Sequence, residues 1–182
     1  MKNNYKYKPF IIFFTGLSAS GKSSICQQLE KKLITLGVKK IKNIDGDNFR
    51  GELKNYRYEN KSRDKVGDYK IRISKNYLKK KYIVIVSGVA HSKEWRKKIK
   101  DNNNNYFEIY LKCSLRVCEE RDYKSQYSRA KKGFIKNLIG VSEPYQEGNS
   151  NDLTINTSRV SITKSINKIL NFLKKKKYVF KK

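Results

Sequence analysis

Cysteines and long apolar runs are scarce in this 182-residue chain. The three cysteines, Cys26, Cys113 and Cys118, form no Cys-x-x-Cys pair, so we expect reduced thiols in an intracellular protein and neither disulfides nor a cysteine-rich metal site. No apolar stretch approaches the roughly 18 residues of a membrane span. Residues 10–14 follow a basic start as in a signal peptide, but the run is shorter than the usual ~7–15 residues. We therefore interpret it as a buried first strand and expect a cytoplasmic protein without a membrane segment.

Acidic residues are also few: 16 Asp and Glu face 43 Lys and Arg, which gives a net charge of +27. Such a charge attracts polyanions, including nucleic acids, anionic membranes and phosphorylated substrates. However, lysine and asparagine recur in runs throughout the chain and form no stripe on any one expected element. We interpret the charge as a compositional bias. A basic nucleic-acid-binding protein is kept as an alternative, which predicts steeply salt-dependent binding.

Apolar runs alternate with helical patterns along the chain, and 12% aromatic residues supply bulk for one core. Strands are predicted over residues 10–14, 38–44, 82–88, 106–111 and 153–156. Helices are predicted over 23–36, parts of 47–80, a short segment starting in EWRKKI, 115–120 and 160–173. This order predicts an α/β fold in one domain over residues 1–182, with a mostly parallel five-stranded sheet and helices on both faces. Residues 122–150 are expected to be loop-rich, and residues 174–182 a frayed basic tail.

The segment from Gly16 to Ser23 matches G-x-x-x-x-G-K-[ST] in full, between a predicted strand and a predicted helix. Such a loop wraps a phosphate closely, which requires glycine, and its backbone N–H groups form an anion-binding nest at the helix N-terminus. Lys22 is expected to reach the β- and γ-phosphates, and the Ser23 hydroxyl to ligate Mg²⁺. The phosphate-binding residues are expected to be Gly16, Ser18, Ala19, Ser20, Gly21, Lys22, Ser23 and Ser24. The sequence therefore predicts the P-loop NTPase fold and use of a nucleoside triphosphate with Mg²⁺.

A second polar cluster, DGDNFR, follows the predicted strand 38–44. It lies at the carboxyl end of a parallel strand, where open α/β sheets bind ligands. Asp47 is our candidate for the catalytic base, and Asp45 for the carboxylate that holds the water shell of the metal. Arg50 is our candidate for a bidentate contact with an anionic acceptor. The alternative is a turn followed by a helix N-cap, which Asp and Asn also favour.

Four segments together resemble one family: GLSASGKSS, DGDNFR, RVCEERDYKSQYSRAKKGFIKNLIGVSEPY and LTINT, in order over about residues 10–158. They are similar to the motifs of adenylylsulfate kinases. The resemblance implies transfer of the γ-phosphate of ATP to the ribose 3′-hydroxyl of adenosine 5′-phosphosulfate, and thus a nucleotide as the acceptor. It also allows a homodimer.

The resemblance assigns roles to individual residues. Lys22 and Asp47 are implied as catalytic, and Arg121, Lys124 and Thr157 join the ATP-binding residues. Arg121 and Lys124 belong to a lid, about residues 121–148, and a closing lid of this kind excludes water from the reaction. Without the resemblance, residues 121–136 would be interpreted as a solvated charged helix. The acceptor-binding residues are implied to be Asp45, Asn48, Arg50, Tyr58, Arg63, His91, Lys136, Asn137 and Leu138.

The chain departs from the family's motifs on the acceptor side. Leu138 replaces a Phe that stacks on the acceptor base, Tyr56 or Tyr58 would have to supply a second ring, and Val66 or Gly67 replaces an Asn. Changed stacking and hydrogen-bonding partners alter the selectivity of a site for a base. A relative of this family phosphorylates the 3′-hydroxyl of cytidine 5′-diphosphoramidate in capsule phosphoramidate biosynthesis, and the departures are of the kind that would accompany such a change of acceptor. The resemblance to that relative leads us to expect cytidine 5′-diphosphoramidate as acceptor, with adenosine phosphosulfate as the alternative.

His91, the only histidine, follows the third strand. It either contacts the acceptor's 5′ group or is a structural residue whose hydrogen bonds are satisfied within the protein.

Two further functional classes are considered for the whole chain. A nucleotide-hydrolysing switch protein would carry a guanine-reading motif, which is missing, and a kinase for a sugar or shikimate-like alcohol does not explain RDYKSQYSRAKKGFIKN.

Overall fold

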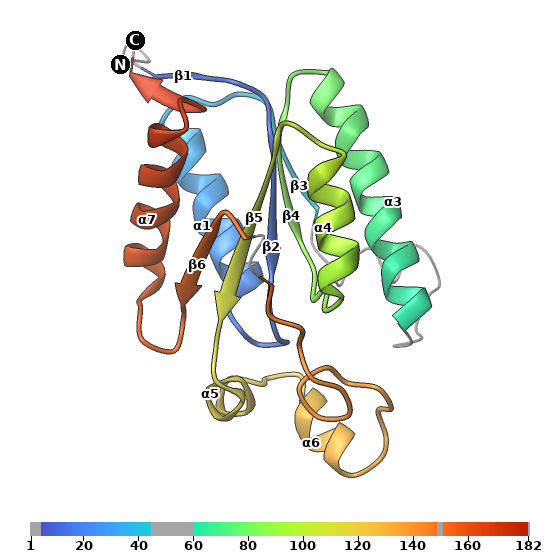
Figure 1. The fold of residues 1–182 in the computed structure, drawn as a ribbon. Coiled ribbons are helices and arrows are strands. Elements are labelled where there is room, and N and C mark those ends of the chain that lie inside the picture. Colours follow the sequence, from blue (N-terminus) through green and yellow to red (C-terminus); the bar gives the residue numbers. More distant parts are fainter. Residues whose placement is uncertain (1–4, 45–59, 149–150, 182) are drawn as a thin grey trace.

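A five-stranded parallel sheet forms the centre of the computed structural model, which describes residues 5–44, 60–148 and 151–181. The strand order is β3-β4-β2-β5-β6, and every neighbouring pair is parallel. The strands are β2 (Ile11–Thr15), β3 (Ile41–Ile44), β4 (Ile83–Ser87), β5 (Tyr106–Lys112) and β6 (Leu153–Asn156). The carboxyl ends of these strands therefore meet at one edge of the sheet, at the bottom of Figure 1.

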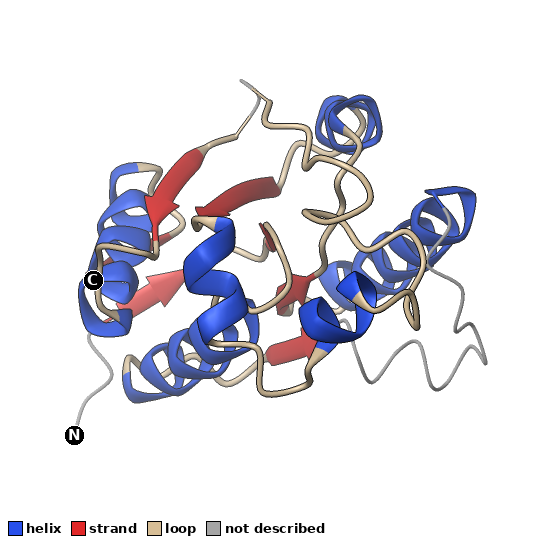
Figure 2. Ribbon diagram, turned by 90° about the horizontal axis from the view of Figure 1, so that it is seen from below, coloured by secondary structure: helices blue, strands red, loops and turns tan. Residues whose placement is uncertain are grey.

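Helices cover both faces of the sheet (Figure 1). On one face lie α1 (Lys22–Thr35) and α7 (Ile162–Lys175), and on the other α3 (Asn60–Lys79) and α4 (Lys93–Asp101). Two short helices, α5 (Leu115–Glu120) and α6 (Gln126–Lys131), lie beyond the carboxyl edge, and Figure 2 views the molecule from that end. None of the described helices is both long and apolar enough to cross a membrane.

The central strand β2 shows why these residues fold into three layers. Its side chains alternate between the faces: Ile12 and Phe14 join the core under α1 and α7, whereas Ile11 and Phe13 join the core under α3 and α4. All five residues of β2 are buried, as expected of a strand covered on both faces. The predicted fold class is thus confirmed. The largest shift of a strand boundary is at β3, which begins at Ile41 and not at residue 38.

The basic C-terminal segment is ordered, and our prediction of a frayed tail is wrong. Lys174 and Lys175 belong to α7, and β7 (Val179–Lys181) pairs antiparallel with β1 (Tyr5–Tyr7). Val179 is fully buried, and the Tyr178 ring lies edge-on to Phe107 with 4.8 Å between the ring centroids. The sequence did not predict this strand because its few apolar residues lie between lysines, so the local composition is polar.

Residues 122–148 are less loop-rich than predicted, because they include α6. Asp122 accepts a hydrogen bond from the Tyr127 backbone N–H at 2.7 Å, which ties down the first turn of this helix. The segment lies over the carboxyl edge of the sheet (Figure 1), where the sequence places the phosphate loop.

Candidate active site

The phosphate loop joins β2 to α1 and depends on two glycines. A Cβ added at Gly16 would lie 2.6 Å from the Leu111 carbonyl oxygen, so only glycine lets the loop start this close to β5. Gly21 has φ 94° and forms the N-cap of α1, a conformation that favours glycine. No described side chain caps α1, so its first N–H groups are available to a phosphate.

Lys22 holds the loop in its present shape, since its Nζ donates to the carbonyl oxygens of Gly16 at 3.0 Å and Leu17 at 2.6 Å. Behind the loop, the buried Thr157 hydroxyl donates to the Ser20 carbonyl at 2.9 Å. Ser20 and Thr157 therefore brace the loop from inside the protein. Their predicted contact with ATP does not follow from their positions.

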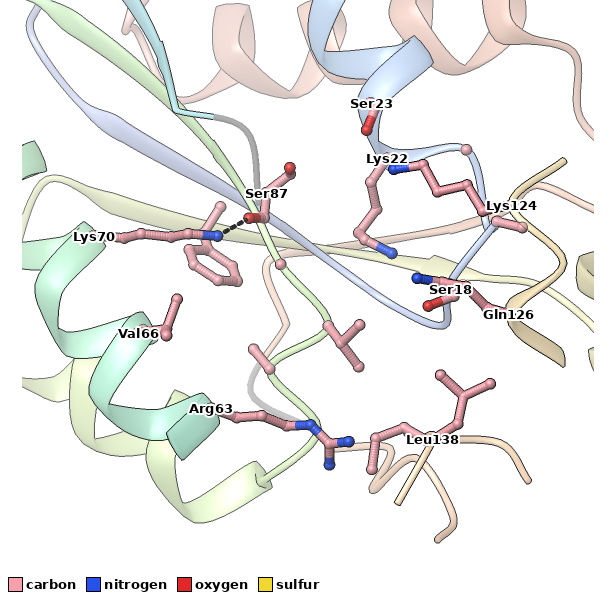
Figure 3. A pocket seen from close by; sticks show the side chains of 18 of the residues that line it. Ser18, Lys22, Ser23, Arg63, Val66, Lys70, Ser87, Lys124, Gln126 and Leu138 are labelled. Atoms are coloured by element: carbon pink, nitrogen blue, oxygen red, sulfur yellow. Dashed lines mark hydrogen bonds between the residues drawn. The ribbon is translucent and has the colours of Figure 1, made fainter. Parts of the chain in front are cut away.

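A cavity of about 400 Å³ opens in front of the loop (Figure 3). Ten of the predicted site residues line it, a selection of which is labelled in Figure 3: Ser18, Ala19, Gly21, Lys22, Ser23, Ser24, Arg63, Arg121, Lys124 and Leu138. The cavity thus brings together the phosphate loop, the start of the predicted lid and one wall from α3.

The lid segment is joined to the phosphate loop through α6. The Tyr127 hydroxyl donates to the Ser18 carbonyl at 2.9 Å, and the ring is 98% buried against Cys118 and Leu138. Burial raises the pKa of Tyr127, so its hydroxyl keeps the proton that it donates. Arg121, at the start of the lid, donates from Nη2 to the carbonyl of Thr157 at 3.1 Å, and Thr157 in turn contacts the phosphate loop. Both contacts fix lid residues relative to the loop.

The opposite wall is formed by α3 and the end of β4. Arg63 donates to the Asn137 carbonyl, which connects α3 to the middle of the lid segment. Lys70, about two turns further along α3 and only 3% exposed, extends to β4 and donates to the Ser87 carbonyl at 2.8 Å. The cavity therefore carries cationic side chains on two walls.

A fully buried ion pair lies behind this wall. Arg96 Nε and Glu108 Oε1 are 2.9 Å apart, and both side chains have no exposed surface. Arg96 also donates to the carbonyls of Ala90 at 2.6 Å and His91 at 2.9 Å, and to that of Gln146 at 2.6 Å. Arg96 thus holds the loop after β4 against the last residues of the lid segment. Burial raises the pKa of Glu108, and the attraction of Arg96 opposes that rise.

Three other predicted acceptor residues do not line the cavity. The His91 ring is buried with its Nε2 3.7 Å from a Glu143 carboxylate oxygen, and burial lowers its pKa, so the ring is neutral at pH 7. Lys136 is exposed, and Asn137 contributes its backbone carbonyl to Arg63. A direct contact of these side chains with the acceptor stays a prediction.

The remaining predictions concern residues 45–59, which lie outside the described residues. They are the candidate base and metal-side carboxylates and the residues expected to hold the acceptor: Asp45, Asp47, Asn48, Arg50 and Tyr58.

Sequence reasoning missed several residues that line the cavity, including Phe13, Ser87, Trp95 and Lys70. One signal was available. Arg63, Val66, Gly67 and Lys70 follow the i, i+3, i+4, i+7 spacing of one helix face, so once Arg63 is assigned to the site the other three belong to the same wall.

Comparisons with known proteins agree with this geometry. A model of the family described as Adenylylsulphate kinase matches residues 8–156. A protein of Thermodesulfovibrio yellowstonii named Adenylyl-sulfate kinase is 37% identical over 93% of this chain and 86% of its own length, and a namesake from Staphylococcus epidermidis is 33% identical over 95% and 88%.

Among solved structures, the Mycobacterium tuberculosis APS kinase CysC, in complex with AMPPNP and APS, superposes with a TM-score of 0.84. It is 27% identical, and the match covers 93% of this chain and 99% of that one. The chain therefore belongs to the adenylylsulphate kinase family of P-loop phosphotransferases, which act on a hydroxyl acceptor.

Proposed function

We propose that the protein transfers the γ-phosphate of ATP to the ribose 3′-hydroxyl of adenylyl sulfate. The observation that carries the proposal is that one cavity contains both the phosphate loop and a second, separate cationic wall on α3. Two anionic ligands can thus lie face to face there. The names of the relatives support ATP as donor and adenylyl sulfate as acceptor.

On the donor side, this chain's residues bind and orient the triphosphate. In the proposed complex the first N–H groups of α1 and the Lys22 ammonium bind the phosphates, and Arg121 and Lys124, which line the same cavity, contact them from the lid. Ser23, which lines the cavity, would hold Mg²⁺, and the bound ion would neutralise charge on the β- and γ-phosphates. The lid excludes water, so that the phosphate reaches the acceptor.

In the proposed reaction, the 3′-hydroxyl oxygen attacks the γ-phosphorus while the bond from that phosphorus to the leaving oxygen of ADP breaks. The hydroxyl proton goes to a general base, for which Asp47 stays our prediction. The products are ADP and the 3′-phosphorylated acceptor.

Our sequence-based preference for cytidine 5′-diphosphoramidate is not supported by the comparisons, which name adenylyl sulfate kinases and no capsule enzyme among the relatives reported above. It remains a second candidate because of one observation. Leu138 lines the cavity, at a position where the family motif has a stacking Phe, so the acceptor base meets an aliphatic side chain there.

An acceptor panel tests the proposal. With Mg-ATP, we expect the highest kcat/KM for adenylyl sulfate among adenylyl sulfate, cytidine 5′-diphosphoramidate, CDP, ADP and gluconate, measured as ADP release. Preference for the cytidine compound would move the assignment to the second candidate. ADP release that needs no acceptor and is stimulated by DNA or RNA would contradict both and favour the nucleic-acid alternative.

The contact between Tyr127 and Ser18 predicts a coupling of the lid to the phosphate loop. The replacement Tyr127→Phe removes the hydrogen bond to the Ser18 carbonyl and leaves the packing of the ring intact. Loss of this hydrogen bond costs about 1 kcal/mol. We expect kcat/KM for ATP to fall about 5- to 10-fold, with a change in Tm of only a few degrees. The exposed Tyr123→Phe, in the same segment, is the matched control. Equal effects of the two changes would argue against a positioning role for Tyr127.

A further inference from the structure

The end of the lid segment is joined to the loop after β4 by a chain of hydrogen bonds that starts at Tyr145. The Tyr145 hydroxyl is 2.9 Å from Thr15 Oγ1, and Thr15 is the last residue of β2, directly before the phosphate loop. Thr15 Oγ1 also donates to the Val89 carbonyl at 2.5 Å. Since a hydroxyl carries one proton and a carbonyl can only accept, Tyr145 is the donor in its contact with Thr15. The chain therefore runs from Tyr145 through Thr15 to Val89.

The Tyr145 ring supports the same loop by a second route. It stacks on the Tyr110 ring, with 5.0 Å between the centroids and 3° between the planes, and the centre of the Arg96 guanidinium lies 5.0 Å from its centroid. Arg96 in turn donates to the carbonyls of Ala90 and His91. Burial raises the pKa of Tyr145 to about 12, so its hydroxyl remains a donor at neutral pH. Three successive carbonyls of the loop thus depend on donors that contact one side chain.

The loop after β4, residues 88–92, has a shape that needs such support. Ala90 has φ 42°, a left-handed conformation that is unfavourable for a residue with a Cβ. A conformation of this kind persists only where the surrounding contacts hold it, and such residues concentrate at functional sites. Gly88, Val89 and Ala90 line the cavity. One part of the cavity wall is therefore a strained segment that is held from behind.

The place of this loop in the sheet assigns it to the acceptor. In the strand order β3-β4-β2-β5-β6, β2 leads into the phosphate loop and β5 into the lid, whereas β4 lies on the other side of β2. In the proposed complex, ATP lies between the phosphate loop and the lid residues Arg121 and Lys124, which line the cavity. The loop after β4 therefore borders the part of the cavity that is left for the second ligand.

We propose that Tyr145 is a positioning residue for the acceptor, which acts through Thr15 and Arg96 to hold the loop after β4 as a wall of the acceptor site. The proposal rests on the proposed function, because it requires a second nucleotide beside ATP. Loss of the Tyr145 hydroxyl removes the donor to Thr15, and the strained loop then relaxes and orients the acceptor less well. The phosphate loop is held by separate contacts from Lys22 and Thr157, so ATP binding is retained.

The test variant is Tyr145→Phe, which removes the hydroxyl and keeps the ring beside Arg96. Kinetics with Mg-ATP and adenylyl sulfate, followed as ADP release, give KM for each substrate, and thermal unfolding gives Tm. Tyr110→Phe is the matched control, because it removes the hydroxyl of the other ring in the stack, which donates to Glu147 of the same segment. Thr15→Val, alone and combined with Tyr145→Phe, shows whether the hydroxyl acts through Thr15.

For Tyr145→Phe we expect KM for adenylyl sulfate to rise about 5- to 10-fold and KM for ATP to stay within about 2-fold of wild type. Tyr110→Phe should change either KM by less than about 2-fold at a similar Tm. In the Thr15→Val background, Tyr145→Phe should add less than about 2-fold, because the chain is already broken. Equal rises of both KM values, equal effects of the two tyrosine variants, or full additivity with Thr15→Val would overturn the proposal.

Failure of the proposed function gives a different result. If adenylyl sulfate is a substrate and Tyr145→Phe leaves its KM unchanged, only the role of Tyr145 is wrong. If wild-type protein does not phosphorylate adenylyl sulfate, the proposed function is wrong, and the same variants are compared with the acceptor that the panel identifies, with the same outcomes. Wild-type protein that phosphorylates no acceptor of the panel would overturn both.

Discussion

The variant Lys22→Met is expected to lose about 10³-fold in kcat/KM for ATP while keeping its fold. The ammonium of Lys22 is the loop's own cation, and it now rests on the carbonyl oxygens of Gly16 and Leu17, from which it can turn to a phosphate. Charge develops on the phosphoryl group and the leaving oxygen during transfer, and a methionine cannot stabilise it. Steady-state kinetics with Mg-ATP and adenylyl sulfate provides the measurement.

The control for this prediction is Lys32→Met, on the exposed face of the same helix α1. It removes the same charge without touching the cavity, and we expect kcat/KM within about 2-fold of wild type and an unchanged Tm. A similar loss in both variants would mean that the overall positive charge matters, and the role assigned to Lys22 would be wrong.

The variant Arg96→Met is expected to lower the free energy of unfolding by about 3–5 kcal/mol, because it leaves the Glu108 carboxylate buried without its partner. It also removes the donors to the carbonyls of Ala90, His91 and Gln146, so activity should fall along with stability. Urea unfolding at pH 7 measures the loss. A loss below about 1 kcal/mol would show that water or a rearrangement replaces the ion pair.

The pH dependence of the stability of Arg96→Met shows whether the buried Glu108 carboxylate causes the loss. The pKa of Glu108 is already raised by burial, and loss of Arg96 raises it further above its value in the unfolded chain. The folded state of Arg96→Met then binds the proton more tightly than the unfolded state, so its stability falls as the pH rises through that pKa and recovers at lower pH. We expect the deficit relative to wild type to shrink between pH 8 and pH 5. The double variant Arg96→Met/Glu108→Gln should recover part of the loss at pH 8, because no buried charge is left.

The central sheet and the donor half of the site could be predicted from the sequence because their signals are local. The apolar run at residues 10–14 and the motif ending in Lys22 and Ser23 each occupy one short segment whose residue types are required by sterics and by phosphate chemistry. The structure places both where the pattern predicts, with Gly16 against β5 and Gly21 at the start of α1.

The wall of the cavity on α3 depends on contacts between distant segments, which the sequence does not display. Lys70 belongs to a lysine-rich helix, yet α3 packs directly on Trp95 at Gly67 and the Lys70 Nζ donates to the Ser87 carbonyl. In the same way, β7 gains its stability from pairing with β1, more than 170 residues away, and its own composition is basic. A lysine-rich composition is typical of solvated segments, and in both places tertiary packing overrides it.

The most direct test of the account is the chemical identity of the product. Wild-type protein is incubated with Mg-ATP and adenylyl sulfate, and the product is analysed by ³¹P NMR and mass spectrometry. The account predicts one new phosphate monoester, coupled to the ribose H3′, on a molecule whose 5′-sulfate is intact, with one ADP formed for each product molecule. Phosphate released to water, or adenylyl sulfate left unchanged while ATP is consumed, would contradict it.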